Sequence, residues 1–359
     1  MLSRAEAQQH SASLKSAAPP DAHGKVLSGA TSGSTGTPLQ FHNTEFGGFI
    51  WHATTLREHF WHRRDLTGKL ASIRAGSTTA RVPDWGFSTR PMRTGPAVQF
   101  DLRAPIADQF AWLQAEMPDY LITYPSNLRA LAQHALDRGE SLPGLRQART
   151  LGEVLNADTR QLIRSAFEVS VADLYSASEV GYLALNCPEV DSHYHVQAET
   201  CLVEILDAAG RTCAEGEPGR VVVSVLHNFA MPLIRYELGD YATPGGPCAC
   251  GRGLPLLREI LGRERNMLRR PNGERFWPSA PAEAWLEAAP VRQFQVVQET
   301  LDGLLVRVVV DGAFTPAEQS AVAQMLQQRL GYPYRLRFER VAAIERSKSG
   351  KYEDFVCRL

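Results

Sequence analysis

Hydrophobic and polar positions follow two different patterns along the chain. Between residues 42 and 170, helical spacing alternates with short apolar runs, which predicts helices over 110–116 and 126–137 and a strand over 120–124. This alternation is typical of a layered α/β fold. From residue 201 the chain becomes β-rich, and the pattern predicts strands over 201–206 and 219–226, joined as a hairpin by a turn at 208–210.

A second, smaller region follows Gly262 and Arg263. Its pattern predicts strands over 293–300, 304–310 and 334–341 and a helix over 316–330. A length of 359 residues is compatible with more than one domain. The predicted fold class is therefore α/β, with a large layered α/β N-terminal domain that carries a β-rich subdomain (1–262) and a small α+β C-terminal domain (263–359).

Composition narrows the classes of protein that the chain can represent. Apolar residues make up 44% and charged residues 21%, which is ordinary for a globular protein, and the formal net charge is −1. Such a balance predicts no nucleic-acid or anionic-membrane partner. No apolar run approaches the length of a membrane span, and residues 1–6 lack the apolar core of a signal peptide, so we expect a cytoplasmic location.

The richest local motif is a glycine turn between two short strands, within residues 28–41. Its glycines let the backbone approach an anion closely, and its hydroxyls and amides can donate to phosphate. The residues are Thr31, Ser32, Gly33, Ser34, Thr35, Gly36 and Thr37. A P-loop is excluded because no lysine follows Gly36. The alternative interpretation is a flexible serine/glycine linker.

Four later segments strengthen the interpretation of this glycine turn as a phosphate-binding motif. They read Tyr-Ser-Ala-Ser-Glu (175–179), Arg-Tyr-Glu-Leu-Gly-Asp (235–240), Gly-Arg-Glu-Arg (262–265) and Arg-Ser-Lys-Ser-Gly-Lys (346–351). Together with the glycine turn they resemble the core motifs of adenylate-forming enzymes, the acyl-CoA synthetase and ligase superfamily. The nearest resemblance is to the phenylacetate–CoA ligase-like branch, which includes capsule-biosynthesis proteins. Relatives of this branch carry a longer segment before the glycine turn, so we expect a shortened N-terminal edge.

This resemblance implies an enzyme that uses ATP and Mg²⁺ to convert a carboxylic acid into an acyl-AMP, with release of pyrophosphate. The glycine turn would hold the β- and γ-phosphates, Glu179 would bind Mg²⁺, Tyr175 would stack on adenine and Ser178 would contact the α-phosphate. Glu179 could instead be a solvated surface carboxylate, and Tyr175 a residue at the edge of the core.

The resemblance assigns further roles to the remaining motifs. Asp240 would accept both ribose hydroxyls, although Arg-Tyr replaces the usual Tyr-Arg before it, and its alternative is a turn aspartate. Gly152 and Glu153 would lie near adenine. Lys351 would neutralise charge on the carboxylate and the α-phosphate, with Lys348 as a weaker candidate and a solvated lysine as the alternative.

Residues 263–359 would form a mobile lid in this family, with Arg263 in the nucleotide site and Arg265 at the hinge. The family often has aspartate where Arg265 stands. Rotation of the lid would switch the enzyme from adenylation to the second half-reaction.

Three cysteines and a histidine form a possible structural zinc set. Cys187 precedes two histidines, and a Cys-x-Cys pair follows on a glycine turn. The residues are Cys187, Cys248, Cys250 and His195, with His193 as the alternative histidine. The spacing is not that of a common zinc finger, so free thiols are the alternative. Some members of the branch carry such a set.

The nature of the acid and of the acyl acceptor is less constrained. Aromatic residues at 85, 87, 100 and 124 favour an aromatic acid, although they could equally be core residues. The resemblance implies CoA as acceptor, with an amine or a carrier-protein phosphopantetheine as alternatives. A nucleotide-binding relative without catalytic activity is the alternative from a different class.

Overall fold

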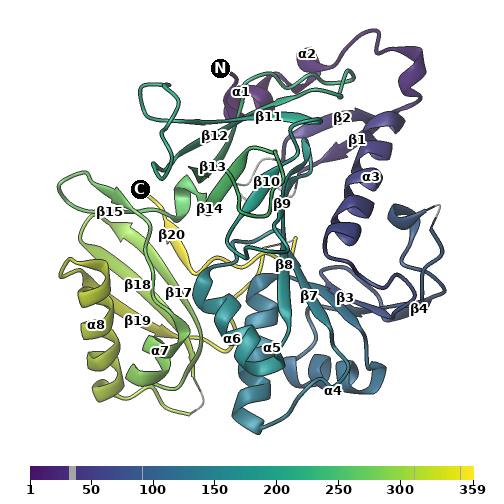
Figure 1. Cartoon of the computed structure of the whole chain (residues 1–359). Helices are drawn as coiled ribbons and strands as arrows, with labels where there is room; N and C mark the ends of the chain where they lie inside the picture. The colour runs from purple at the N-terminus through teal and green to yellow at the C-terminus, as the bar shows by residue number, and fades with distance from the viewer. Residues whose placement is uncertain (32–37, 91, 311, 348) are drawn as a thin grey trace. The chain divides into compact units, whose positions relative to one another are not determined.

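The computed structural model describes residues 1–31, 38–90, 92–310, 312–347 and 349–359. The chain forms two compact units, Met1–Leu155 with Leu162–Leu261 and Asn156–Gln161 with Gly262–Leu359 (Figure 1). Both units combine helices with β-sheet, which confirms the predicted α/β class. The assignment of separate functions to the two parts stays a prediction.

A mixed sheet organises the first unit. Among the described residues it has 12 strands in the order β11-β12-β13-β14-β10-β9-β8-β7-β6-β3-β5-β4. Strands β5, β3, β6, β7 and β8 pair in parallel with one another, whereas β4 and the strands β9 to β14 pair antiparallel where their registers are defined. The bounds are β3 (Leu70–Arg74), β4 (Ala80–Val82), β5 (Ala97–Asp101), β6 (Tyr120–Thr123), β7 (Gln147–Leu151), β8 (Ser170–Ala177), β9 (Gly181–Asn186), β10 (Tyr194–Val196), β11 (Cys201–Leu206), β12 (Gly219–Val225), β13 (Tyr236–Gly245) and β14 (Leu256–Arg263).

Helices cover both faces of the parallel half of this sheet (Figure 1). On one face, α4 (Ile106–Glu116), α5 (Pro125–Arg138) and α6 (Ala157–Phe167) contribute to one core with the strands. On the other face, α3 (Glu45–Trp61) packs Trp51 and Trp61 against Tyr182 and Leu185 of β9. The predicted helices at 110–116 and 126–137 are therefore confirmed, and α4 begins four residues earlier than predicted.

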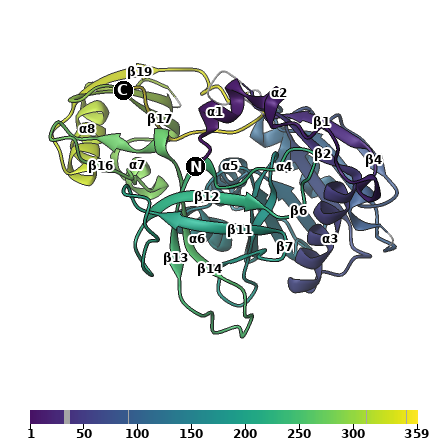
Figure 2. The same ribbon diagram turned by 90° about the horizontal axis from the view of Figure 1, so that it is seen from above.

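The N-terminal segment contributes two short helices and a hairpin to the first unit. Helices α1 (Arg4–Gln9) and α2 (Ser11–Leu14) are followed by the turns η1 (Asp21–His23) and, after α3, η2 (Phe87–Thr89). Strands β1 (Val26–Ala30) and β2 (Gln40–Thr44) pair antiparallel with Ala30 opposite Gln40, as the pattern of strand, turn and strand predicted (Figure 2).

The β11–β12 hairpin differs from the prediction in its connection. The two strands pair antiparallel as expected, but Leu206 lies opposite Arg220, so the connection is longer than a tight turn. A small turn at 207–211 closes on itself through a bridge between Leu206 and Thr212, and the chain then runs on to β12. The side chain of Asp207 accepts from two backbone amides of this turn, which explains why the turn signal was strong.

The second unit is a four-stranded sheet with two helices. The strands lie in the order β19-β18-β17-β20, with β17 and β18 antiparallel and the outer strands parallel to their neighbours. The bounds are α7 (Ala282–Ala288), α8 (Pro316–Leu330), β17 (Val291–Thr300), β18 (Gly303–Val310), β19 (Arg335–Arg340) and β20 (Phe355–Cys357), with the turn η3 (Glu264–Asn266) and the pair β15 (Leu268–Arg269) and β16 (Arg275–Phe276). A capping box of Thr315 and Glu318 begins α8, and Gly331 in the left-handed conformation ends it.

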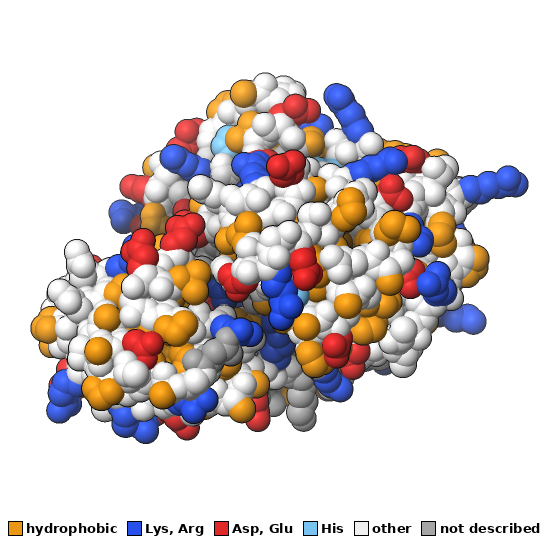
Figure 3. Space-filling model, turned by 90° about the horizontal axis from the view of Figure 1, so that it is seen from below, with side chains coloured by type: hydrophobic (Ala, Val, Ile, Leu, Met, Phe, Trp, Pro, Cys, Tyr) orange, Lys and Arg blue, Asp and Glu red, His pale blue; other side chains and the backbone are white. Residues whose placement is uncertain are grey.

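Charged side chains of both signs are interspersed over the face drawn in Figure 3, as the near-zero net charge predicts. In the described part of the chain, no helix has the length and apolar character required to cross a membrane.

Candidate active site

Three adjacent parallel strands end at one edge of the large sheet. Strands β6, β7 and β8 end at Thr123, Leu151 and Ala177, and predicted site residues follow directly after two of these ends. Gly152 and Glu153 follow β7, whereas Ser178 and Glu179 follow β8. Ligands of α/β proteins bind at the carboxyl ends of parallel strands, so the topology alone brings these residues to a common edge.

The two residues after β7 have different structural roles: Gly152 adopts a left-handed backbone conformation, and Glu153 caps the start of α5. Gly152 has a φ of 79°, which favours glycine. The carboxylate of Glu153 accepts a hydrogen bond of 2.9 Å from the backbone amide of Ser126, in the first turn of α5. An acidic group stabilises a helix N-terminus, so Glu153 has a structural role in addition to the predicted place near adenine.

Tyr175 and Asp240 are brought together from the two halves of the sheet. Tyr175 lies on β8 and is buried, and its hydroxyl donates a 3.0 Å hydrogen bond to Oδ2 of Asp240 on β13. Gly239 precedes Asp240 with a φ of 81°, so the backbone conformation favours glycine here. Two residues 65 positions apart, both predicted to bind nucleotide, therefore form one polar pair.

Glu179 is a buried carboxylate and not a solvated surface residue. Its exposed fraction is 5%, and its Oε1 atom accepts hydrogen bonds from Nη1 of Arg4 at 2.9 Å and from the hydroxyl of Tyr236 at 3.1 Å. Burial, and then the charge of Glu179, raise the pKa of Tyr236, so the phenol stays protonated and able to donate. Among the described residues no contact engages the other oxygen of Glu179.

Thr31 connects this group to the glycine turn. Its hydroxyl accepts hydrogen bonds from Nη2 of Arg4 and from the backbone amide of Leu39, which closes the stem of the β1–β2 hairpin. The remaining predicted turn residues (Ser32, Gly33, Ser34, Thr35, Gly36 and Thr37) lie outside the described residues.

The predicted residues of the C-terminal part belong to the second unit. A turn at 347–351 is closed by hydrogen bonds between Ser347 and Lys351, in which the Ser347 amide donates to the Lys351 carbonyl at 2.9 Å. Gly350 within it has a φ of 83°, which explains the glycine before Lys351. Arg263 ends β14, and Arg265 pairs with Glu353. Lys348 lies outside the described residues.

The cysteine and histidine set forms a compact group in the first unit. The ligand atoms of Cys187, His195, Cys248 and Cys250 all lie within 4.8 Å of one another. The sulfur atoms of Cys187 and Cys248 are 3.9 Å apart, and Cys250 Sγ lies 3.3 Å from His195 Nε2. Tetrahedral zinc with ordinary bond lengths requires edges of about 3.8 Å between sulfurs and about 3.5 Å between sulfur and nitrogen, so the group fits the ion.

The two candidate histidines occupy different places around this group. His195 is fully buried and directs Nε2 to Cys250, whereas His193 contacts the Cys248 sulfur at 3.3 Å from outside the four-residue group. The geometry thus favours His195 as the fourth ligand. His195 lies within β10, whereas His193 precedes the first residue of that strand, Tyr194, so strand geometry does not fix the direction of the His193 side chain.

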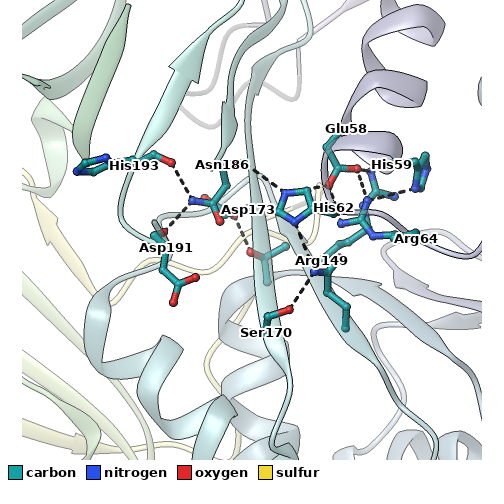
Figure 4. A network of polar contacts seen from close by, with 12 residues as sticks. Glu58, His59, His62, Arg64, Arg149, Ser170, Asp173, Asn186, Asp191 and His193 are labelled. Atoms are coloured by element: carbon teal, nitrogen blue, oxygen red, sulfur yellow. Dashed lines mark hydrogen bonds and ion pairs between the residues drawn. The ribbon is translucent and has the colours of Figure 1, made fainter. Parts of the chain in front are cut away.

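A buried charge network lies between α3 and β7 in the first unit (Figure 4). Glu58 of α3 pairs with Arg64 at 2.6 Å and with Arg149 of β7 at 2.7 Å, and these three side chains are at most 4% exposed. Burial lowers the pKa of His59 to about 2 and that of His62 to about 4, so both rings are neutral. The motif analysis missed this network, because its members are far apart in the sequence and match no motif.

Two residues of the predicted acid pocket occupy contrasting surroundings. Trp85 packs with Leu70, Ala97 and Tyr120, the residues that begin β3, β5 and β6, so it lies in the core at the opposite edge of the sheet. Tyr124 directly follows β6 at the carboxyl edge and is buried. The alternative interpretation as a core residue therefore holds for Trp85.

Arg4 and Tyr236 are functional candidates that the motifs did not single out. Tyr236 lies within the segment 235–240, four positions before Asp240, so its place in that segment gave a signal that could have been used. Arg4 lies outside every motif, and only the folded chain brings it to Glu179.

The fold is similar to that of solved CoA ligases. A 2-hydroxyisobutyryl-CoA ligase in the postadenylation state superposes with a TM-score of 0.76 and 20% identity, over 99% of this chain and 79% of that one. An anthranilate CoA ligase in complex with anthranoyl-AMP matches with a TM-score of 0.65 and 15% identity, over 92% of this chain and 66% of that one. At these identities the likeness establishes the fold.

Sequence comparison gives two further similarities. Residues 278–358 match the CapK C-terminal domain. A phenylacetate-coenzyme A ligase of Thermus thermophilus is 30% identical over 217 residues, which represent 57% of this chain and 48% of that protein. The matched region thus spans about half the length of that curated relative. These similarities confirm the predicted resemblance to the phenylacetate–CoA ligase-like branch of the adenylate-forming superfamily.

Proposed function

We propose that the protein activates a carboxylic acid with ATP to give an acyl-AMP and pyrophosphate, and then transfers the acyl group to CoA. The observation that carries this proposal is a pair of hydrogen bonds between β13 and the end of β8, from Tyr175 to Asp240 and from Tyr236 to Glu179, in a fold similar to that of CoA ligases. The relatives with this fold include CoA ligases bound to acyl-AMP, which supports the same order of steps.

Each residue has a task that its surroundings permit. The ring of Tyr175 provides a face for adenine, while its hydroxyl fixes the Asp240 carboxylate that would accept the ribose hydroxyls. The glycine turn would bind the phosphates, and Ser178, which is exposed, would contact the α-phosphate. Lys351 of the second unit would neutralise the charge that develops when the acid attacks phosphorus.

Glu179 fits the requirements of a magnesium ligand. Mg²⁺ is usually held by one or two carboxylates together with the phosphates, and Glu179 presents a carboxylate whose Oε2 carries no contact among the described residues. When bound, the ion would neutralise charge on the phosphate oxygens. The chain's own contribution is to hold the carboxylate in place through Tyr236.

Zinc would have a structural task. The four atoms of the cysteine and histidine group fill all positions of a tetrahedral ion, which leaves none for a substrate. The site joins β10 to the segment after β9 and to the Cys-x-Cys turn before β14, and it would hold these pieces together.

The substrate acid is proposed to be aromatic, because CoA ligases for anthranilate and benzoate share the fold and Tyr124 lies at the carboxyl edge. An amide bond synthetase also shares the fold, with a TM-score of 0.59, so an amine is the second candidate acceptor.

A panel of acids tests the function. Purified protein is incubated with ATP, Mg²⁺ and single aryl or alkyl acids, and pyrophosphate release is followed against a reaction without acid. We expect release with at least one aromatic acid, an acyl-AMP by mass spectrometry, and a thioester when CoA is added. No release with any acid would contradict adenylation, and product formation only with an amine or a carrier protein would identify the other acceptor.

A further inference from the structure

Arg4, at the start of α1, reaches residues of the candidate active site. Its guanidinium bonds three side chains at once, namely Glu179 at 2.9 Å, the Tyr236 hydroxyl at 3.1 Å and the Thr31 hydroxyl at 3.0 Å. The Arg4 side chain is 17% exposed and that of Glu179 is 3% exposed, so the pair is largely shielded from water. A planar guanidinium suits such a bridge, because its N–H groups point in fixed directions.

Several contacts fix the segment that carries Arg4. A capping box between Ser3 and Glu6 begins α1, and Ala7 on the same helix is fully buried in the core. Before the helix, the backbone of Leu2 donates to the Arg235 carbonyl at 2.9 Å and accepts from the Glu237 amide at 2.8 Å. The chain therefore enters α1 alongside β13, next to Tyr236, and the position of Arg4 follows from this anchoring.

Arg4 links the stem of the glycine turn, at Thr31, to the turn after β8 that carries Glu179. Thr31 is the last described residue before the glycine turn. Its hydroxyl accepts hydrogen bonds from the Arg4 guanidinium and from the Leu39 amide. Glu179 stands in the turn after β8. Among the described residues Arg4 is the cation paired with Glu179, and a buried carboxylate without such a partner is costly.

We propose that Arg4 is a positioning residue of the nucleotide site, which orients Glu179 and holds the stem of the glycine turn at a fixed distance from it. This inference rests on the proposed function for its effect on ATP, but the positioning itself is a property of the folded chain. Arg4 acts through Glu179 and Thr31, and no step of the chemistry is assigned to it.

The test compares Arg4→Met and Arg4→Lys with wild type and with Arg211→Met, a control that removes an 80% exposed arginine paired with Asp207. Amide hydrogen exchange is measured over residues 26–31, 38–44 and 176–181, and binding of AMP is measured by calorimetry. We expect faster exchange in these segments and at least tenfold weaker AMP binding in Arg4→Met. Arg4→Lys should be intermediate, because one ammonium replaces a fork of N–H groups.

The outcomes separate this inference from the proposed function. Wild-type exchange in both Arg4 variants would overturn the positioning role, as would weaker AMP binding without faster exchange. A wild-type protein that binds no adenine nucleotide would contradict the proposed function, while the exchange data would still decide the role of Arg4. If Arg4→Met does not fold, the comparison of Arg4→Lys with Arg211→Met gives the same decision.

Discussion

The hydroxyl of Tyr175 donates a 3.0 Å hydrogen bond to the carboxylate of Asp240, across the boundary between the parallel and the antiparallel parts of the sheet. The bond orients the carboxylate from one side. A neutral phenol is a suitable partner for this purpose, because it fixes an anion without cancelling its charge.

Replacement of Asp240 should therefore weaken nucleotide binding. Hydrogen bonds to a charged group contribute about 1.5–3 kcal/mol, so Asp240→Ala should raise the dissociation constant of AMP roughly 10- to 100-fold. Tyr175→Phe keeps the ring for stacking and removes the hydroxyl that donates to Asp240, and should have a smaller effect. Calorimetric titration measures both, with Asp137→Asn on the exposed side of α5 as the control. Unchanged AMP affinity in Asp240→Ala would remove Asp240 from the site.

Lys351 should affect the chemical step more than stability. Loss of one group that stabilises developing charge costs about 10²–10³ in rate, so Lys351→Met should lower acid-dependent pyrophosphate release by that factor. The turn at 347–351 is closed by Ser347 through backbone atoms of Lys351, so the substitution leaves the turn intact.

Two comparisons make the Lys351 result specific. Arg335→Met removes a 78% exposed cation from the same unit and should leave the rate unchanged. Thermal unfolding of Lys351→Met should match wild type. A near-normal rate of pyrophosphate release would show that Lys351 has no part in adenylation.

The sequence predicted those features that depend on local order along the chain. The β1–β2 hairpin and the helix at 316–330 each rest on a pattern within a short segment, and the structure contains both. The cysteine and histidine set spans residues 187–250 and was predicted from its residue types, and its ligand atoms lie together in the structure. The Arg4–Glu179 pair joins residues 175 positions apart, and Glu58 meets Arg149 across two elements. Such contacts depend on the strand order, which periodicity does not determine.

The sequence also could not decide which histidine belongs to the zinc site. Spacing left both His193 and His195 open as zinc ligands. The folded chain distinguishes them, because His195 lies within β10 and joins the group of ligand atoms, whereas His193 precedes the strand and contacts the group from outside.

Removal of zinc should destabilise the first unit. Purified protein should contain one zinc per chain, measured by elemental analysis, and treatment with a chelator should lower the melting temperature by about 5–10 °C. Cys250→Ser should reproduce the loss of zinc and of stability, because it removes one of four ligands. Cys357→Ser, in the second unit, is the matched control and should do neither. Full stability in a zinc-free protein would contradict a structural ion.

The buried network around Glu58 should make the first unit sensitive to acid. Burial lowers the pKa of His62 to about 4 from its ordinary 6.5, and Arg64 adds to this effect, although Glu58 opposes it. Between these two pH values the unfolded chain binds a proton that the folded chain does not. The stabilising contribution of neutral His62 is therefore complete above pH 6.5 and decreases as the pH falls, by about 3 kcal/mol at its limit.

Glu58 adds a second acid-sensitive contribution of the same sign. The charges of Arg149 and Arg64 outweigh its burial and hold the pKa of Glu58 far below the ordinary 4.5, so its contribution is present above that pH and is lost as the pH falls further. Urea unfolding at a series of pH values should show a free energy of unfolding that falls continuously below pH 6.5. His62→Gln should give a shallower decline, because one titrating group is absent, while the exposed His10→Gln should follow wild type. An identical decline in His62→Gln and wild type would show that His62 titrates alike in the folded and unfolded chain (Figure 4).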